Sequence, residues 1–389
     1  MIATVLAFAA ASSFPSCGAA PDPDPTGPLT VYVSVPLRGP AGENGLDIAD
    51  GAELALERAD GMAGDVETEI EVLDDTEGPP DRARWSPAAV AANARAASED
   101  TSAIAYIGDF ESGATRVSLP ITNQAMVPQV SPASTALDLV APAGGGNEVP
   151  ELVQPTGERS FVRVIPDDRV QAEAAAAWAR RLGVQRATAV SDGSEFGDQV
   201  VEEFTEEAEG LGIELLAVGG SRRASRRQTG LLYYGGQNAD RLILRLTGAA
   251  PDALLMSTDA LLMDSSFLAS AGELEPRVRL TASAENPEQL PPAGQDFVAA
   301  FEREYGRAPG PYAAYGYEAM ALVLDAIERA GSEGEDRRSV LDALLDTTNR
   351  DSVLGTYSIT ATGDTTLDAI AGYRVAAGHP VFDRPLAAP

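Results

Sequence analysis

The 389-residue sequence contains no lysine, a single cysteine and a single histidine. With only Cys17 and His379 available, the chain cannot form an internal disulfide, a cysteine-thiolate metal site or a cysteine–histidine nucleophile. It also has no G-x-S-x-G elbow, no P-loop and no dinucleotide fingerprint. Carboxylates alone can support hydrolysis, but we identify no acid–base pair. We therefore expect a protein that is not an enzyme and that uses no cofactor and no metal ion.

Positive charge is scarce as well. Arginine supplies all 28 basic side chains against 59 acidic ones, which gives a formal net charge of −31. Nucleic-acid phosphates repel such a chain, so we exclude nucleic acid as a partner. The apolar content of 44% and the charged content of 22% are typical of a folded, soluble protein, and the length suits two lobes of ordinary domain size.

The N-terminal apolar segment, residues 2–14, is too short to span a membrane. A small residue then precedes Cys17, which resembles a bacterial lipoprotein signal, and residues 18–28 form a tether rich in proline and aspartate. We expect residues 1–17 to be a signal peptide with its lipidation site at Cys17. The product would be a cell-envelope lipoprotein anchored by its lipid to the outer face of the cytoplasmic membrane. A secretory leader with an incidental cysteine is the alternative, because Pro15 is unusual in the cleavage box.

Short apolar strands alternate with segments of helical period through most of the chain after the tether. Residues 29–35 have the alternation of a strand, and residues 46–59 have helical spacing. Ser86-Pro87 provides a hydroxyl N-cap followed by proline at the first helical position. This order predicts an α/β fold with parallel sheets that are covered by helices on both faces. Residues 357–375 instead predict a β-hairpin near the C-terminus.

Two loops of small hydroxyl residues each follow a buried strand and precede a helix. The first loop is residues 108–115 and the second is residues 131–135. Helix N-termini offer unpaired N–H groups and partial positive charge, which suit a carboxylate. Two such loops on neighbouring strands can hold the α-carboxylate and α-ammonium of an amino acid. Ordinary strand-to-helix turns rich in capping residues are the alternative.

Segments on both sides of these loops complete a recognisable pattern: Leu37-Arg38-Gly39-Pro40, Leu73-Asp74-Asp75, Phe161-Val162-Arg163, Tyr233-Tyr234-Gly235-Gly236 and Ala313-Ala314-Tyr315-Gly316-Tyr317. In this order they resemble the leucine/isoleucine/valine-type substrate-binding proteins of branched-chain amino acid ABC transporters. The resemblance covers nearly all of the chain after the tether. Its most specific parts are the serine loop and the Ser-Pro-Ala-x-Thr loop.

The resemblance implies a type I periplasmic-binding fold, in which three crossovers join two Rossmann-like lobes and the ligand lies between them. Lobe one would comprise residues 29–157 and 283–352. Lobe two would comprise residues 158–282 and 353–389. A ligand between the lobes also agrees with a general property of open parallel sheets, whose ligands bind beyond the carboxyl ends of the strands.

The resemblance also assigns ligand contacts residue by residue. Ser112 would bind the ligand carboxylate through its hydroxyl and amide, and Thr135 would contact both charged groups. Ala133 would offer its carbonyl to the ammonium, and Ser134 belongs to the same loop. Asp259 would pair with the ammonium, because a desolvated cation needs an opposite charge. A solvated loop aspartate or a helix cap is the alternative for Asp259.

Four further positions complete the expected site. Phe196 would stack over the ligand and Tyr315 would line the cleft, although packing in the core explains either aromatic side chain equally well. Asn44 and Gln237 stand where relatives carry aromatic residues. Polar groups in a desolvated pocket favour a ligand with polar atoms of its own.

Together these features predict a monomeric extracytoplasmic binding protein of an ABC importer. It would capture an amino acid, branched-chain or more polar, and present it to a membrane permease. Contacts that the ligand makes with both lobes only when they are shut would drive closure. An extracellular sensor subunit that uses the same cleft for signalling is the alternative, and the sequence does not separate the two.

Overall fold

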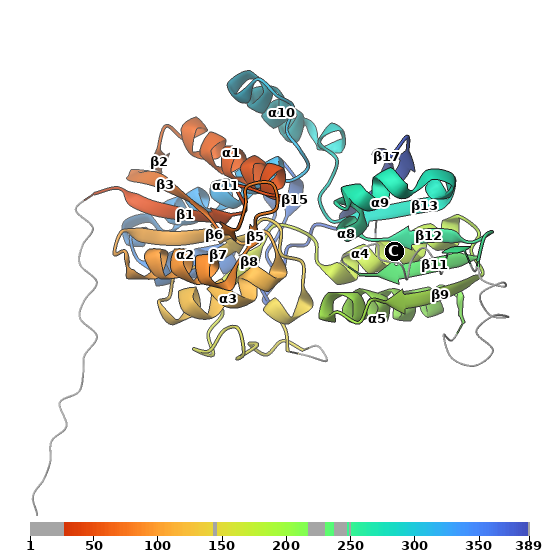
Figure 1. The fold of residues 1–389 in the computed structure, drawn as a ribbon. Coiled ribbons are helices and arrows are strands. Elements are labelled where there is room, and N and C mark those ends of the chain that lie inside the picture. Colours follow the sequence, from red (N-terminus) through yellow and green to blue (C-terminus); the bar gives the residue numbers. More distant parts are fainter. Residues whose placement is uncertain (1–26, 143–145, 217–229, 237–246, 249, 388–389) are drawn as a thin grey trace, which may run out of the picture.

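The structure is a computed structural model that describes residues 27–142, 146–216, 230–236, 247–248 and 250–387. Its ribbon forms two bodies side by side, each built around one large sheet (Figure 1). We call the body with the six-stranded sheet lobe one and the body with the seven-stranded sheet lobe two. Helices flank both sheets, which confirms the predicted α/β class.

The lobe-one sheet has the strand order β2-β3-β1-β6-β7-β8. All its pairings are parallel except that of β2 with β3. The central strands are fully buried because helices cover both faces. The strands are β1 (Leu29–Val35), β2 (Met62–Ala63), β3 (Val66–Asp74), β6 (Ala103–Gly108), β7 (Gln129–Ser131) and β8 (Phe161–Arg163).

The helices of lobe one form a layer on each face of this sheet. One layer is α1 (Gly42–Arg58) packed along α11 (Ala313–Ala330), and the other is α2 (Pro87–Glu99) beside α3 (Ser112–Gln124). The Ser86 hydroxyl accepts a hydrogen bond from the Ala89 amide at 3.0 Å, as the predicted N-cap of α2 requires. The remaining elements are β4 (Thr76–Glu77), β5 (Arg84–Trp85), α10 (Pro292–Tyr305), α12 (Arg337–Leu345), β14 (Arg350–Ser352) and β15 (Gly355–Tyr357).

The lobe-two sheet has the strand order β10-β9-β11-β12-β13-β16-β17. Its first five strands are parallel, and β16 and β17 are antiparallel additions. The strands are β9 (Arg186–Ser191), β10 (Glu214–Leu215), β11 (Leu231–Gly235), β12 (Leu254–Ser257), β13 (Val278–Ala282), β16 (Ala369–Ala376) and β17 (His379–Ala387). The described helices are α4 (Asp168–Arg181), α5 (Glu195–Gly210), α8 (Asp259–Leu262) and α9 (Ser265–Ser270).

The hairpin predicted within residues 357–375 is confirmed at its turn, where Ile359 and Thr365 form an isolated antiparallel bridge, but its predicted second strand pairs elsewhere. Tyr357 pairs with Arg350 in a separate small sheet, and β16 pairs with β13 and β17. The turn between β16 and β17 has positive φ at both Ala377 (52°) and Gly378 (75°). That geometry matches the twist of a two-residue hairpin, so the antiparallel pair forms there instead.

The chain passes between the lobes at three places in its described part: residues 164–167, 283–286 and 358–368. We call these the first, second and third connections. Because β8 pairs with β7, the lobe-one sheet extends to Arg163, although we expected lobe two to begin at residue 158. The division of the chain into domains otherwise remains a prediction. Within the described ranges, no helix has both the length and the apolar character of a membrane span.

Candidate ligand-binding site

The two predicted hydroxyl loops lie against each other. Ser112 begins α3 directly after β6, and the loop of residues 131–136 follows the neighbouring strand β7. The Ser112 Oγ atom accepts hydrogen bonds from the backbone N–H groups of Thr135 and Ala136, both at 3.2 Å. We call residues 131–136 the ligand loop. Its contact with the N-terminus of α3 brings Ser112 and Thr135 together, as the sequence led us to expect.

Other polar groups of the ligand loop fix its shape. Ser131 Oγ accepts hydrogen bonds from the N–H groups of Ala133 (3.3 Å) and Ser134 (2.9 Å). The Ser134 side chain is fully buried, and its hydroxyl bonds to Thr115 Oγ1 (2.7 Å) and donates to the Asp109 carbonyl (3.0 Å). The Ser134 hydroxyl therefore holds the two loops together, a different role from the ligand contact we expected.

A pair of carboxylates faces the ligand loop from lobe two. The Asp168 amide donates to the Thr135 carbonyl at 3.0 Å, which places the start of α4 beside the loop. The Asp168 side chain is buried and forms no ion pair in the described residues, and a side-chain hydrogen bond from the neutral Thr135 lowers its pKa. Asp259, at the start of α8, accepts hydrogen bonds from Gln171 of lobe two and Tyr312 of lobe one, both at 3.4 Å.

Burial dominates the electrostatics of this pair. Burial raises the pKa of Asp168 to about 7; the Asp259 and Asp167 charges raise it too, while Thr135 and Arg163 oppose the rise. Burial also raises the pKa of Asp259. A positive charge beside two desolvated carboxylates stabilises their ionised forms. The buried hydroxyl of Tyr233 has no hydrogen-bond partner in the described residues, and burial, followed by the charges of Asp168 and Asp259, raises its pKa.

The remaining predicted residues lie elsewhere or have other partners. Tyr315 is buried, and its hydroxyl donates to the Ser283 carbonyl (3.2 Å) and accepts from the Glu285 amide (3.0 Å). Its hydroxyl therefore links α11 to the second connection. We had expected this side chain to line the ligand cleft instead. Phe196 is partly buried in the first turn of α5 and packs against the lobe-two core.

Asn44 lies at the rim between the lobes. Its side-chain amide is 3.4 Å from the sulfur of Met263, so α1 of lobe one contacts the segment between α8 and α9 of lobe two. Gln237 and Cys17 lie outside the described residues.

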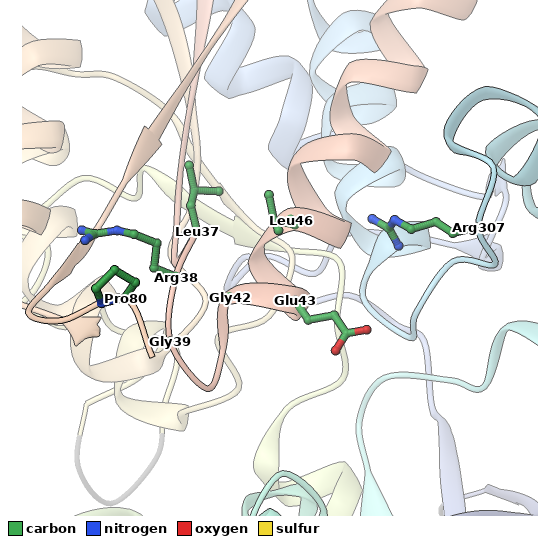
Figure 2. A pocket seen from close by; sticks show the side chains of 8 residues that line it. All are labelled: Leu37, Arg38, Gly39, Gly42, Glu43, Leu46, Pro80 and Arg307. Atoms are coloured by element: carbon green, nitrogen blue, oxygen red, sulfur yellow. The ribbon is translucent and has the colours of Figure 1, made fainter. Parts of the chain in front are cut away.

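One pocket in the described part of the chain has a volume of about 460 Å³ and lies on lobe one at the start of α1 (Figure 2). Its two arginines already have acidic partners: Arg38 pairs with Asp74 at 2.6 Å, and Arg307 pairs with Asp47 at 2.5 Å. None of the predicted ligand residues lines it, so we do not assign it the ligand. Its lining is Leu37, Arg38, Gly39, Gly42, Glu43, Leu46, Pro80 and Arg307.

No group of three or more His, Cys, Asp or Glu in the described residues is placed to hold a metal ion. The adjacent acids Asp74 and Asp75, at the end of β3, have separate environments. Burial raises the pKa of Asp74, but hydrogen bonds from Thr76 and Arg38 outweigh it and bring the pKa below its ordinary value. Asp75 points into the protein, where it is fully buried.

Sequence reasoning missed Asp168, Gln171 and Tyr233. Asp168 stands shortly after β8, at the same edge of the sheet as the two hydroxyl loops, so its place at a strand end was the available signal. Its lack of an ion-pair partner depends on how the two lobes meet, which no local sequence pattern indicates.

The family to which the chain belongs is now clear. A family model described as periplasmic binding protein matches residues 28–380, which is most of the chain. The chain therefore belongs to the periplasmic binding proteins and has the two-lobed type I fold. This confirms the resemblance found in the sequence.

Solved structures agree on the fold. The leucine-binding protein LivK from Thermotoga maritima is 22% identical, with a TM-score of 0.70, and the match covers 92% of this chain and 99% of that one. An ABC transporter substrate-binding protein from Desulfitobacterium hafniense in complex with Leu is 21% identical, with a TM-score of 0.71, over 92% and 100% of the two chains. A solute-binding protein from R. palustris in complex with benzoate is 18% identical, with a TM-score of 0.68, over 93% and 97%. No curated protein matches this sequence.

Proposed function

We propose that this protein captures an amino acid, or a ligand with the same carboxylate and ammonium groups, between its lobes. The buried pair Asp168 and Asp259 carries the proposal. The side chains that hydrogen-bond to these carboxylates, Thr135 for the first and Gln171 and Tyr312 for the second, are neutral. A ligand ammonium between them would supply the missing positive charge.

The opposite end of the ligand would lie at the start of α3. The first amides of a helix have no partner within the helix and attract negative charge. Ser112 stands at this position, and its hydroxyl oxygen already accepts two N–H groups of the ligand loop. Its hydroxyl hydrogen is therefore left to donate to a ligand carboxylate.

The acidic pair also separates two classes of ligand. The Desulfitobacterium relative holds leucine, which carries an ammonium group, and the R. palustris relative holds benzoate, which does not. Benzoate would bring a third negative charge to two desolvated carboxylates in this chain. We therefore propose zwitterionic ligands and not simple carboxylates, with polar side chains admitted by Asn44.

Thermal unfolding with each of the twenty L-amino acids, and with benzoate as the control, tests this proposal. We expect at least one amino acid to raise the melting temperature and benzoate to leave it unchanged. Failure of every amino acid would contradict the proposal.

The pH dependence of binding provides a sharper test. An ammonium favours the ionised form of Asp168, whose pKa is about 7 without ligand. Affinity should therefore rise as the pH is increased from about 6 to 8, with release of a proton. Asp168→Asn should weaken binding and remove the pH dependence in calorimetric titrations. The same pH profile in wild type and variant would show that Asp168 does not bind the ligand.

We further propose that the chain serves an ABC importer from outside the cytoplasm and is anchored through lipid on Cys17. The family assignment and the leader-like N-terminal sequence support this role. Mass spectrometry of the membrane fraction would detect the lipid, and Cys17→Ser should release the protein. Uptake of labelled ligand that does not require this chain, despite intact binding, would favour the sensor alternative.

A further inference from the structure

Arg163 is a buried cation at the end of β8, where the chain leaves lobe one. It has 0% exposed surface. A guanidinium removed from water must have its charge and its donors satisfied by the protein. Its partners therefore identify the segments that this residue holds in place.

One set of partners belongs to the ligand loop. Arg163 Nη1 donates to the carbonyl oxygens of Ala136 at 2.8 Å and Ser134 at 3.2 Å. The amides of Thr135 and Ala136 in the same loop bond to Ser112. The loop is thus held between Ser112 on one side and Arg163 on the other.

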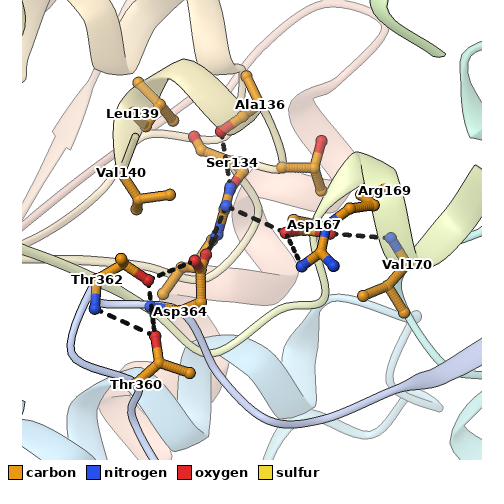
Figure 3. Close-up of polar contacts among 12 residues, drawn as sticks. Ser134, Ala136, Leu139, Val140, Asp167, Arg169, Val170, Thr360, Thr362 and Asp364 are labelled. Carbon is orange, nitrogen blue, oxygen red and sulfur yellow. Dashed lines mark hydrogen bonds and ion pairs between the residues drawn. The ribbon is translucent and has the colours of Figure 1, made fainter. Parts of the chain in front are cut away.

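The other partners belong to the connections between the lobes. Arg163 Nε and Nη2 lie 2.7 and 2.6 Å from the Oδ1 atom of Asp364, in the third connection. The Arg163 amide donates to the Gly363 carbonyl at 2.9 Å. Nη2 also lies 3.7 Å from Asp167, in the first connection, which caps α4 through the Val170 amide. Figure 3 shows these partners converging from the three segments.

We propose that Arg163 is the positioning residue that couples the ligand loop to the first and third connections and thereby sets the angle between the lobes. This inference rests on the proposed function for its link to ligand binding. The guanidinium is planar and rigid, so a displacement of the loop carbonyls moves Nε and Nη2 with them. The carboxylates of Asp364 and Asp167 must then follow, and each belongs to a segment that joins the lobes.

A second arginine provides a matched control. Arg350 Nε lies 2.7 Å from Glu318 Oε1, and the side chains are 16% and 1% exposed. This ion pair joins β14 to α11 within lobe one, and the other side-chain partners of these two residues, Asp325 and Tyr357, also belong to lobe one. Arg350→Met should cost stability as Arg163→Met does, without changing the angle between the lobes.

Distances between spin labels on the two lobes test the proposal. Exposed Glu57 on α1 and Glu209 on α5 are replaced by cysteine and labelled, in the full chain with Cys17→Ser. Distance distributions are recorded without ligand and with an equimolar mixture of the twenty L-amino acids. We expect Arg163→Met to roughly double the width of the unliganded distribution and to abolish the shift that the mixture causes. Arg350→Met should keep the wild-type width of the unliganded distribution and the wild-type shift with the amino-acid mixture.

A wild-type distribution in Arg163→Met would overturn the proposal, and so would equal broadening in both variants. If Arg163→Met does not fold, Asp364→Asn serves as the second variant, because it removes the carboxylate charge and keeps the shape of the side chain. A wild-type distance distribution in Asp364→Asn would equally overturn the proposal. The unliganded comparison decides the role of Arg163 even if no amino acid binds the wild type. Failure of the wild type to close with the mixture counts against the proposed function alone.

Discussion

At the scale of single residues, Ser112 shows how one side chain can organise two loops. Its oxygen accepts the backbone N–H groups of Thr135 and Ala136. Removing the hydroxyl would leave two donors of a largely buried loop without a partner, at a cost comparable to a lost hydrogen bond for each. The same change would remove the donor that we assign to a ligand carboxylate.

Ser112→Ala should therefore weaken ligand binding by about 1–3 kcal/mol, as expected when a charged group loses a hydrogen bond. Calorimetry with the amino acid that stabilises the wild type most measures this loss. Ser112→Thr, which keeps the hydroxyl, is the control and should retain most of the affinity. Unchanged affinity in the alanine variant would place the ligand away from the start of α3.

The sequence predicts part of this site and not the rest, for a physical reason. Hydroxyl residues directly after a buried strand are a local signal, and from this signal we correctly predicted that Ser112 and Thr135 lie close together. Whether a side chain is free to meet a ligand depends on its neighbours in the fold. The hydroxyls of Ser134 and Tyr315 form hydrogen bonds within the protein, whereas Asp168 is buried without an ion-pair partner in the described residues. Neither outcome is visible in the spacing of residues.

At the scale of elements, the contact between α1 and α11 depends on two glycines. A Cβ atom on Gly51 would lie 2.1 Å from the Ala313 carbonyl oxygen, and one on Gly316 would lie 2.1 Å from the Ile48 carbonyl oxygen. The helical spacing of residues 46–59 predicted most of α1, which begins at Gly42. The close approach of the two helices was not predictable, because the two segments lie far apart in the sequence and neither contains a signal for the other.

Gly51→Ala should destabilise the protein by about 1–3 kcal/mol or more, because the added methyl group overlaps a backbone carbonyl that cannot move aside cheaply. Urea unfolding measures the change. Gly210→Ala is the matched control: it lies at the end of α5, and nothing lies within 4 Å of its added Cβ. Since alanine restricts the unfolded chain, the control should gain about 0.4–1 kcal/mol. Equal effects of the two variants would contradict this account of the packing.

At the scale of the whole molecule, the excess of acidic residues and the burial of some of them together determine how stability depends on pH. The net charge of −31 follows from the sequence alone, but the sequence does not indicate which acids are buried. Asp75 is 0% exposed, and neither of its oxygens has a hydrogen-bond partner in the described residues. Burial, with the nearby charges of Asp109 and Glu111, raises its pKa to about 9. Burial also raises the pKa of Glu111 to about 7.

These acids make the folded protein bind protons that the unfolded chain releases. The free energy of unfolding should therefore rise as the pH falls from about 9 towards 4, the ordinary range of a carboxyl. Below that range the trend reverses, because hydrogen bonds hold the pKa values of Asp74 and Asp100 below their ordinary value despite burial. Urea unfolding at a series of pH values should show maximum stability in mildly acidic solution.

Asp75→Asn separates the effect of this buried acid on stability from the effect of repulsion between surface charges. The variant should be more stable than the wild type near pH 9 and should have a flatter pH profile, because the amide has no proton to lose. Asp81→Asn changes the net charge equally at a side chain that is 70% exposed, so it should keep the wild-type slope. If Asp75→Asn and Asp81→Asn give the same slope, Asp75 is ionised in the folded protein, and the pH dependence comes from surface repulsion.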